Sequence, residues 1–211
     1  MNRSSSGPAK TLPFLVGSSA LALYLSFPSL RHNFDGVACA IAVELGDLRH
    51  LAHGNHLAYG LVGLLFHRLL NGLGPVISAV WSLQLMDSLL GALAAGLFTR
   101  SLLRRGRQAG AAAAAGLGLA VSYGWWLRSV DAQVYLLAAP FMVLAFEETL
   151  SERPRPLRPA ALHTAAMLAH ASHACFAPVA VWSLLKSERP AGEARAALGR
   201  YLALCFFAVL A

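Results

Sequence analysis

The sequence predicts an all-α, polytopic transmembrane helical bundle with amphipathic helices at the membrane interface, and three observations support this class. Hydrophobic residues make up 57% of the 211 residues and charged residues 13%, more apolar side chain than one water-soluble core normally uses. The apolar residues form runs that approach the thickness of a bilayer. The basic residues form short clusters between those runs, so membrane topology explains the net charge of +7 better than binding of nucleic acid.

The N-terminal segment, residues 1–11, is polar and basic, and we expect it in the cytoplasm, followed by a transmembrane module at residues 12–211. The run at residues 12–30 is longer than the apolar region of a signal peptide and lacks a small-residue cleavage site, so we predict a retained first span. The three cysteines are widely separated, which favours neither a disulfide framework nor a zinc site.

A helix needs roughly 20 residues to cross the apolar core of a bilayer. Three segments approach or meet this length: residues 12–30, 76–98 and 109–126. Residues 132–146 are shorter but flanked by charge, and we expect them to span as well. A last apolar run begins at residue 198, and the chain ends within it, which is typical of the N-terminal module of a longer membrane protein.

Two apolar segments leave alternatives open. Residues 57–70 are short and contain His67 and Arg68, so they form either a span or a surface helix. Residues 160–185 form either one long span or two short helices folded back at residues 171–178.

The basic residues favour the surface helix, because it places the arginines at 100–107 in the cytoplasm with the N-terminus. With the folded-back pair as well, 13 of the 17 Lys and Arg residues are cytoplasmic. These are Arg3, Lys10, Arg100, Arg104, Arg105, Arg107, Arg153, Arg155, Arg158, Lys186, Arg189, Arg195 and Arg200. The four outside are Arg31, Arg49, Arg68 and Arg128.

Small residues recur at every fourth position of the third predicted span. Such a stripe is typical of a helix face that packs closely against a neighbour. It consists of Gly110, Ala114, Gly118 and Ser122.

The predicted first outside loop, residues 31–75, collects polar side chains beside the membrane. Apolar residues from Val37 to Leu45 follow helical spacing, which predicts an amphipathic surface helix with Asp35 at its N-terminus. Asp is a favoured N-cap residue, so a capping role and a chemical role for Asp35 both stay open.

The next outside turn, residues 125–135, carries Arg128 and Asp131. They either pair with each other or serve as a phosphate ligand and an acidic group. Trp125, Trp126 and Tyr135 are interpreted as interfacial anchors.

Two further groups of polar side chains lie within apolar segments. Asp87 lies in the middle of a predicted span, where a carboxylate needs a cavity or a polar partner. His163, His170 and His173 lie near the predicted fold-back, but their spacing does not favour a metal site.

The order of motifs resembles the membrane glycosyltransferases of the GT-C fold, the superfamily of protein O-mannosyltransferases and lipid A aminoarabinose transferases. The motifs are Asn33-Phe-Asp-Gly36, His53-Gly-Asn-His-Leu-Ala-Tyr59, Gln84-Leu-Met-Asp-Ser88 and Asp131-Ala-Gln-Val-Tyr135, followed by the segment with His170 and His173. The resemblance implies transfer of a sugar from a polyprenyl-phosphate-linked donor at the outer face of the plasma (inner) membrane.

The resemblance also implies roles for individual residues. Asp35, the acidic residue that opens the first outside loop, takes the place of the catalytic base. Substrate-binding roles are implied for residues of both outside loops and of the fold-back: Arg128, Asp131, Gln133, His53, His56, His170 and His173. No metal ligand is assigned, although the resemblance leaves the need for a divalent metal open. The chain departs from many relatives by having His-Gly-Asn-His in place of His-Pro-Pro-Gly, and Gln133 in place of Glu.

Two other classes fit the same sequence. A non-catalytic or truncated membrane scaffold needs none of these side chains. A small transporter would use Asp87 as its coupling site.

Overall fold

The computed structural model describes residues 8–74, 76–151, 155–186 and 190–210. Within these ranges the chain is helical and contains no strand, so the prediction of an all-α fold is confirmed. Residues 1–7 of the predicted cytoplasmic segment and Arg153, Arg189 and Ala211 lie outside the described ranges.

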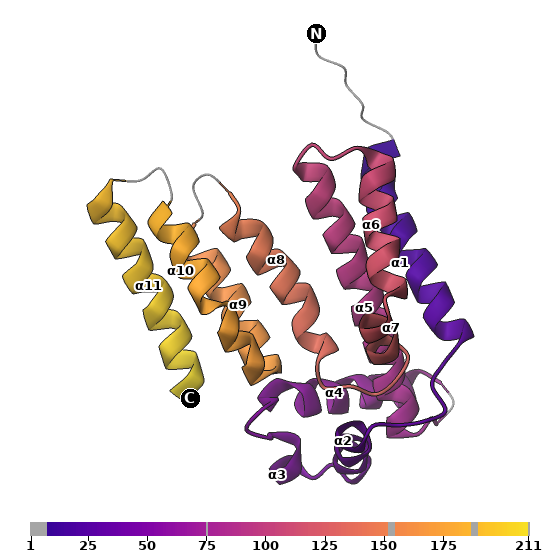
Figure 1. The fold of residues 1–211 in the computed structure, drawn as a ribbon. Coiled ribbons are helices and arrows are strands. Elements are labelled where there is room, and N and C mark those ends of the chain that lie inside the picture. The colour runs from indigo at the N-terminus through magenta and orange to yellow at the C-terminus, as the bar shows by residue number, and fades with distance from the viewer. Residues whose placement is uncertain (1–7, 75, 152–154, 187–189, 211) are drawn as a thin grey trace.

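The helices form two upright groups and one transverse layer (Figure 1). The first upright group contains α1 (Pro8–Ser26), α5 (Ala79–Arg104), α6 (Ala109–Val121) and α7 (Tyr123–Ser129). The second group contains η1 (Leu136–Ala138), α8 (Ala139–Thr149), α9 (Leu157–Ala169), η2 (Ala171–Phe176), α10 (Ala177–Lys186) and α11 (Ala191–Leu210). The transverse layer contains α2 (Phe34–Leu45), α3 (Leu48–Leu51) and α4 (Leu57–Leu73).

The arrangement bears on both segments with open alternatives. Helix α4 lies across the lower ends of the upright helices instead of alongside them (Figure 1), as expected for the surface helix. Residues 160–185 form α9 and α10 with the short η2 between them, so the folded-back pair is present.

Helix α5 occupies the centre of the first group and contacts α1, α2, α4, α6, α7 and α8. Of the part of the chain that the structure describes, it is the one helix long and apolar enough to cross a membrane. The predicted span at 109–126 is divided between α6 and α7 because the backbone is extended at Ser122. The Ser122 hydroxyl donates to the carbonyl of Leu119 there, 2.7 Å away.

The two ends of the upright helices differ in composition. Helix α5 ends, and α6 and α9 begin, at the upper end in Figure 1, where the chain also enters α1. We call this the arginine end, after Arg100, Arg104, Arg105, Arg107 and Arg158. The opposite, loop end carries the transverse layer, residues 130–135 and η2 (Figure 1).

Close helix packing depends on small residues, but not on the predicted stripe. Gly110 and Gly118 of α6 have open space where a Cβ would lie, so the prediction that this face packs closely is wrong. The buried face of α6 is instead formed by Ala112, Gly116 and Ala120. In a helix composed mostly of Ala and Gly, a small residue at every fourth position does not by itself identify the face that packs against a neighbouring helix.

Gly36 in α2 lies against the backbone of residues 130–135. A Cβ on Gly36 would collide with the carbonyl group of Ala132. The absence of a side chain therefore allows α2 to approach this segment.

Gly36→Ala is expected to lower the melting temperature of the purified protein by several degrees, because overpacking against fixed backbone costs about 1–3 kcal/mol. Gly118→Ala is the matched control, since Gly118 is also helical but open. It should leave the melting temperature unchanged or raise it, because Ala favours helix over Gly. Equal melting temperatures for the two variants would contradict the close approach of α2.

Candidate functional site

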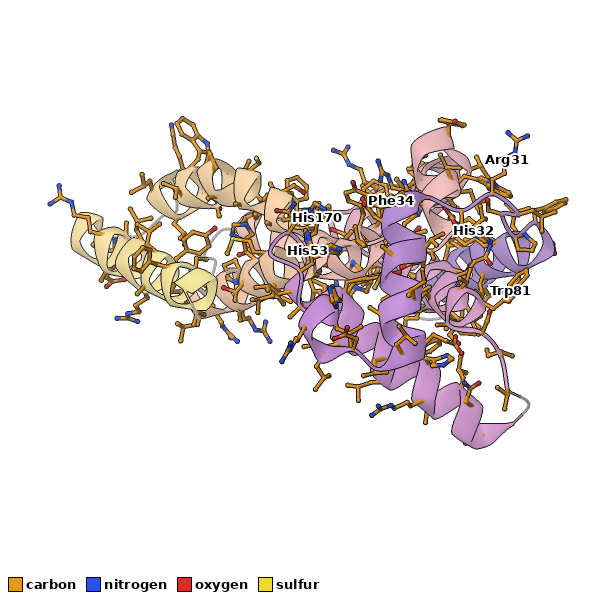
Figure 2. All side chains as sticks on the ribbon, turned by 90° about the horizontal axis from the view of Figure 1, so that it is seen from below. Arg31, His32, Phe34, His53, Trp81 and His170 are labelled. Atoms are coloured by element: carbon orange, nitrogen blue, oxygen red, sulfur yellow. The ribbon has the colours of Figure 1, made fainter. Side chains whose placement is uncertain are left out.

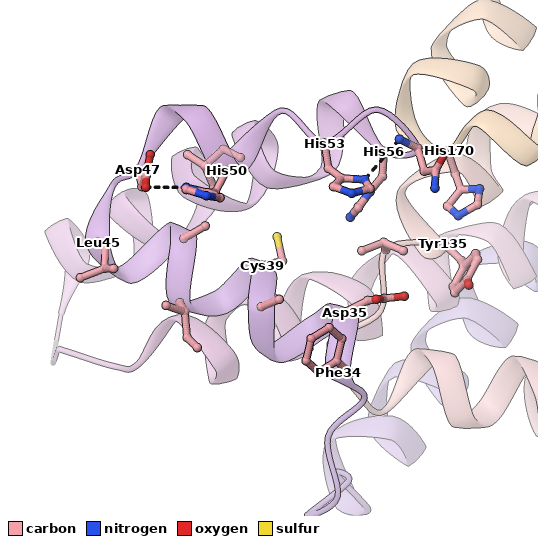
Figure 3. A pocket seen from close by; sticks show the side chains of 16 residues that line it. Phe34, Asp35, Cys39, Leu45, Asp47, His50, His53, His56, Tyr135 and His170 are labelled. Atoms are coloured by element: carbon pink, nitrogen blue, oxygen red, sulfur yellow. Dashed lines mark hydrogen bonds and ion pairs between the residues drawn. The ribbon is translucent and has the colours of Figure 1, made fainter.

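A cavity of about 730 Å³ opens at the loop end between α2, α3 and the turn that follows α3 (Figure 3). Its wall is mostly apolar along α2. Its polar side chains come from Asp35 of α2, from Asp47 and His50 at α3, from the turn, and from residues 135 and 170. The lining residues are Phe34, Asp35, Ala38, Cys39, Ile41, Ala42, Leu45, Asp47, His50, Leu51, His53, Asn55, His56, Val134, Tyr135 and His170.

Asp35 lies in the first turn of α2, but it is not the N-cap. Asn33 caps the helix, and its side-chain oxygen accepts from the Asp35 amide at 2.9 Å. The Asp35 carboxylate therefore extends into the cavity, on the side of Tyr135 (Figure 3). It has no hydrogen-bond partner within the described ranges.

The second carboxylate of the cavity is already engaged. Asp47 caps α3 by accepting from the Arg49 amide at 3.0 Å, and it pairs with the His50 ring at 2.6 Å. The hydrogen bond with His50 is the main reason that the pKa of Asp47 is lowered. Asp35 is thus the cavity carboxylate that is left available for a ligand.

Residues 53–56 form a tight turn that places two imidazole rings over the cavity. The His56 amide donates to the His53 carbonyl at 2.9 Å, and the ring centroids lie 4.6 Å apart. The carbonyl of Asn55 accepts from the Ala171 amide at 2.7 Å, which attaches the turn to η2. This bond places His170 near the two rings, as Figure 2 shows for His53 and His170.

A row of rings continues from this turn across the base of the cavity. The His170 centroid lies 6.5 Å from that of His56 and 4.5 Å from that of Tyr135. The guanidinium carbon of Arg128 lies 4.1 Å from the Tyr135 centroid, a cation–π contact. Four segments distant in the sequence thus contribute to one site.

The pKa values of two imidazoles in this row, those of His56 and His170, are lowered, which favours their neutral forms. Burial lowers the pKa of His56, the rings of His53 and His170 add to the shift, and Asp35 opposes it. Burial also lowers the pKa of His170, assisted by Arg128. The Nδ1 atom of His56 is buried without a hydrogen-bond partner within the described ranges.

Cys39 lines the same cavity but is not suited to nucleophilic chemistry. Burial, followed by the charge of Asp87, raises the pKa of this thiol to about 12. The thiolate is the reactive form, and it is scarce at neutral pH.

Asp131 and Gln133, predicted to bind substrate, lie behind the cavity and do not line it. The Asp131 carboxylate is buried and accepts from the Asn33 amide at 3.1 Å and the Gln133 side chain at 2.8 Å, and it pairs with His32 at 2.9 Å. Asp131 therefore pairs with His32 and not with Arg128. Both residues position the site, because they join the segment that enters α2 to residues 131–133.

His173 is also outside the cavity lining. Its centroid lies 6.2 Å from that of His170, and burial lowers its pKa. The Nε2–H of buried His163 donates to the His173 carbonyl at 2.7 Å, and the Tyr201 hydroxyl donates to Nδ1 at 2.6 Å. His163 thereby ties η2 to α9 and α11.

Asp87 is completely buried and connects three segments. Its Oδ2 atom accepts from the Tyr59 hydroxyl at 2.7 Å and from the Gln133 amide at 2.6 Å. The carboxylate therefore holds α4 and the segment that follows α7 against α5.

Tyr135 is the member of the site that the sequence did not identify. It was predicted to be an interfacial anchor, yet its ring lies between His170 and Arg128. Its position two residues after Gln133, a predicted site residue, could have indicated that it belongs to the site. A Tyr at a predicted membrane boundary is equally typical of an interfacial anchor, so the sequence did not distinguish the two roles.

Among the described residues, no group of three or more His, Cys, Asp and Glu side chains has an arrangement that could hold a metal ion. No known protein family, curated protein or solved structure matches the chain. The chemistry of the site is therefore inferred from its geometry.

The lowered pKa values of His56, His170 and His173 predict that stability falls in acid. The unfolded chain binds protons to these imidazoles more readily than the folded chain, so stability is complete above the ordinary His pKa of about 6.5 and is lost as the pH falls below it.

This prediction is checked by measuring the melting temperature between about pH 7.5 and 5.5, across that ordinary pKa. His56→Gln and His170→Gln should flatten the decrease, whereas His50→Gln, at an exposed position, should not. If the melting temperature falls by the same amount with pH in all three variants, groups other than His56 and His170 cause the decrease.

Proposed function

We propose that this chain is a polytopic membrane glycosyltransferase of GT-C type, with its N-terminus in the cytoplasm. Large apolar side chains on the upright helices face outward in support of the membrane location, among them Phe14 at 75% exposure and Trp182 at 65%. An apolar surface of this kind is favoured in lipid and costly in water. The arginine end would lie in the cytoplasm and the loop end outside.

The observation that carries the enzymatic proposal is the free carboxylate of Asp35 at the wall of a large cavity. A general base needs a position from which it reaches the acceptor hydroxyl, with its oxygens unoccupied. Asp35 meets this condition because Asn33 performs the capping, and Asp47, the other carboxylate, is engaged by His50.

The other walls of the cavity suit a lipid-linked sugar donor. Phe34, Ile41 and Leu45 of α2 are exposed apolar residues at its lining, suitable for a polyprenyl chain. Arg128, at the end of the ring row, is the cation for the donor phosphate. The imidazoles of His53, His56 and His170 offer hydrogen bonds to sugar hydroxyls.

In the proposed reaction the acceptor oxygen bonds to the anomeric carbon of the sugar, and the bond from that carbon to the phosphate oxygen breaks. The acceptor proton passes to Asp35. The polyprenyl phosphate leaves with the electron pair, and its negative charge is stabilised by Arg128.

Asp35→Asn should reduce transfer of sugar from a polyprenyl-phosphate donor by about 10²–10⁴-fold, the usual contribution of a general base. Transfer is measured with the full-length protein in membranes, using a labelled donor. Glu193→Gln, an equivalent change at an exposed position in the first turn of α11, should leave the rate unchanged. Full activity of Asp35→Asn with a normal melting temperature would exclude Asp35 as the base.

The membrane orientation is testable independently of catalysis. Single cysteines at Gln108 and Ala52, both exposed, are placed in a Cys39→Ala, Cys175→Ala, Cys205→Ala background. An impermeant thiol reagent added to intact cells should label position 52 and should label position 108 only after the cells are opened. Labelling of position 108 in intact cells, and of position 52 only in opened cells, would overturn the proposed orientation. The chemistry of the cavity is tested separately by Asp35→Asn.

A further inference from the structure

A second cavity, of about 520 Å³, opens at the arginine end between α5, α8 and α9. Its charged lining consists of Arg100 and Arg104 of α5, Glu147 and Glu148 of α8, and Arg158 of α9. It lies at the opposite end of the upright helices from the site with Asp35.

The charges of this cavity favour an anionic ligand. Three guanidinium groups face two carboxylates, and Glu147 is shared by Arg100 at 3.1 Å and Arg104 at 2.6 Å. The Nε atom of Arg100 is buried without a hydrogen-bond partner within the described ranges. One positive charge is therefore left over.

The guanidinium groups also lie nearer to the opening than the carboxylates. The side chains of Arg104 and Arg158 are 64% and 61% exposed, whereas those of Glu147 and Glu148 are 14% and 27% exposed. An entering anion therefore meets the arginines first.

The part of the cavity farther from the arginine end is apolar. Leu144 precedes Glu147 by about one helical turn, and Ala161 and Leu162 follow Arg158 by about one turn. These residues lie farther from the arginine end than the charged ones. A ligand that fills the cavity consequently has an anionic head and an apolar tail.

A narrower apolar groove of about 280 Å³ runs between α1 and α5 and also reaches Arg100. It is lined by apolar residues that include Phe14, Leu21 and Leu93. The apolar part of the first cavity and this groove are two apolar channels that both reach Arg100. Two such channels match a ligand with two acyl chains.

We propose that the arginine end binds an anionic glycerophospholipid, with its phosphate on Arg104 and Arg158 and its acyl chains in the two apolar channels. This inference goes beyond the glycosyl transfer at the other end and depends only on the proposed membrane location. Basic side chains at the cytoplasmic surface attract anionic lipids, and the apolar floor favours a lipid over a free phosphate.

The test measures lipid binding to the detergent-solubilised full chain by native mass spectrometry. Dioleoyl phosphatidylglycerol should bind more tightly than phosphatidylcholine with the same acyl chains. Arg158→Gln should weaken binding of phosphatidylglycerol about fivefold, the equivalent of one basic side chain near an anionic surface. Arg158→Lys keeps the charge and should retain binding. Arg49→Gln, at an exposed position of the loop end, is the matched control and should change nothing.

Glu148→Gln separates lipid binding from a purely structural ion pair. Glu148 holds Arg158 at 3.2 Å, so its neutralisation should free the guanidinium and tighten binding of phosphatidylglycerol. If Glu148→Gln and Arg158→Gln weaken binding equally, the pair is structural and the proposal fails.

Two further results would overturn the proposal. Equal binding of phosphatidylcholine would show that the arginines do not select the lipid. Competition by glycerol phosphate at the same concentration as phosphatidylglycerol would indicate a site for a soluble anion. Asp35→Asn should leave lipid binding unchanged, so this proposal and that for glycosyl transfer can fail separately.

Discussion

The geometry of the loop end depends on the hydrogen bonds of one buried group, the carboxylate of Asp131. It bonds to the His32 ring, the Asn33 amide and the Gln133 side chain. It therefore joins the segment that enters α2 to the turn at residues 131–135. A buried carboxylate is stable only when its oxygens are satisfied, and these bonds satisfy them. The N-cap of α2, and with it the placement of Asp35, follows from this junction.

Asp87 holds the same turn from the opposite side. It accepts from the Gln133 amide and from the Tyr59 hydroxyl, which attaches the turn to α5 and α4. Residues 131–135 are therefore fixed between two buried carboxylates, and Val134 and Tyr135 form the base of the cavity. Asp131 and Asp87 thus build the site, Asp47 is engaged by His50, and the carboxylate of Asp35 has no hydrogen-bond partner among the described residues.

The two ends of the molecule use charge in different ways. At the loop end, burial keeps the imidazoles of His56 and His170 neutral next to a carboxylate, an arrangement suited to hydrogen bonding with a polar substrate. At the arginine end, Glu147 offsets Arg100 and Arg104 only in part. In the proposed membrane orientation, the first end handles a sugar and the second meets anionic lipid.

The sequence by itself determined the all-α class, because apolar length is a local property. The distribution of arginines favoured a surface helix at residues 57–70. For residues 160–185 the sequence left one span and a folded-back pair open, and the structure decided for the pair α9 and α10. The sequence also identified Asp35, His53, His56 and His170, which lie in one cavity. Only the tertiary structure decided that Asp131 and Gln133 support the site from behind, that Tyr135 belongs to it, and which face of α6 is buried. Those outcomes depend on contacts between residues up to about a hundred positions apart, such as His32 with Asp131, which no local pattern encodes.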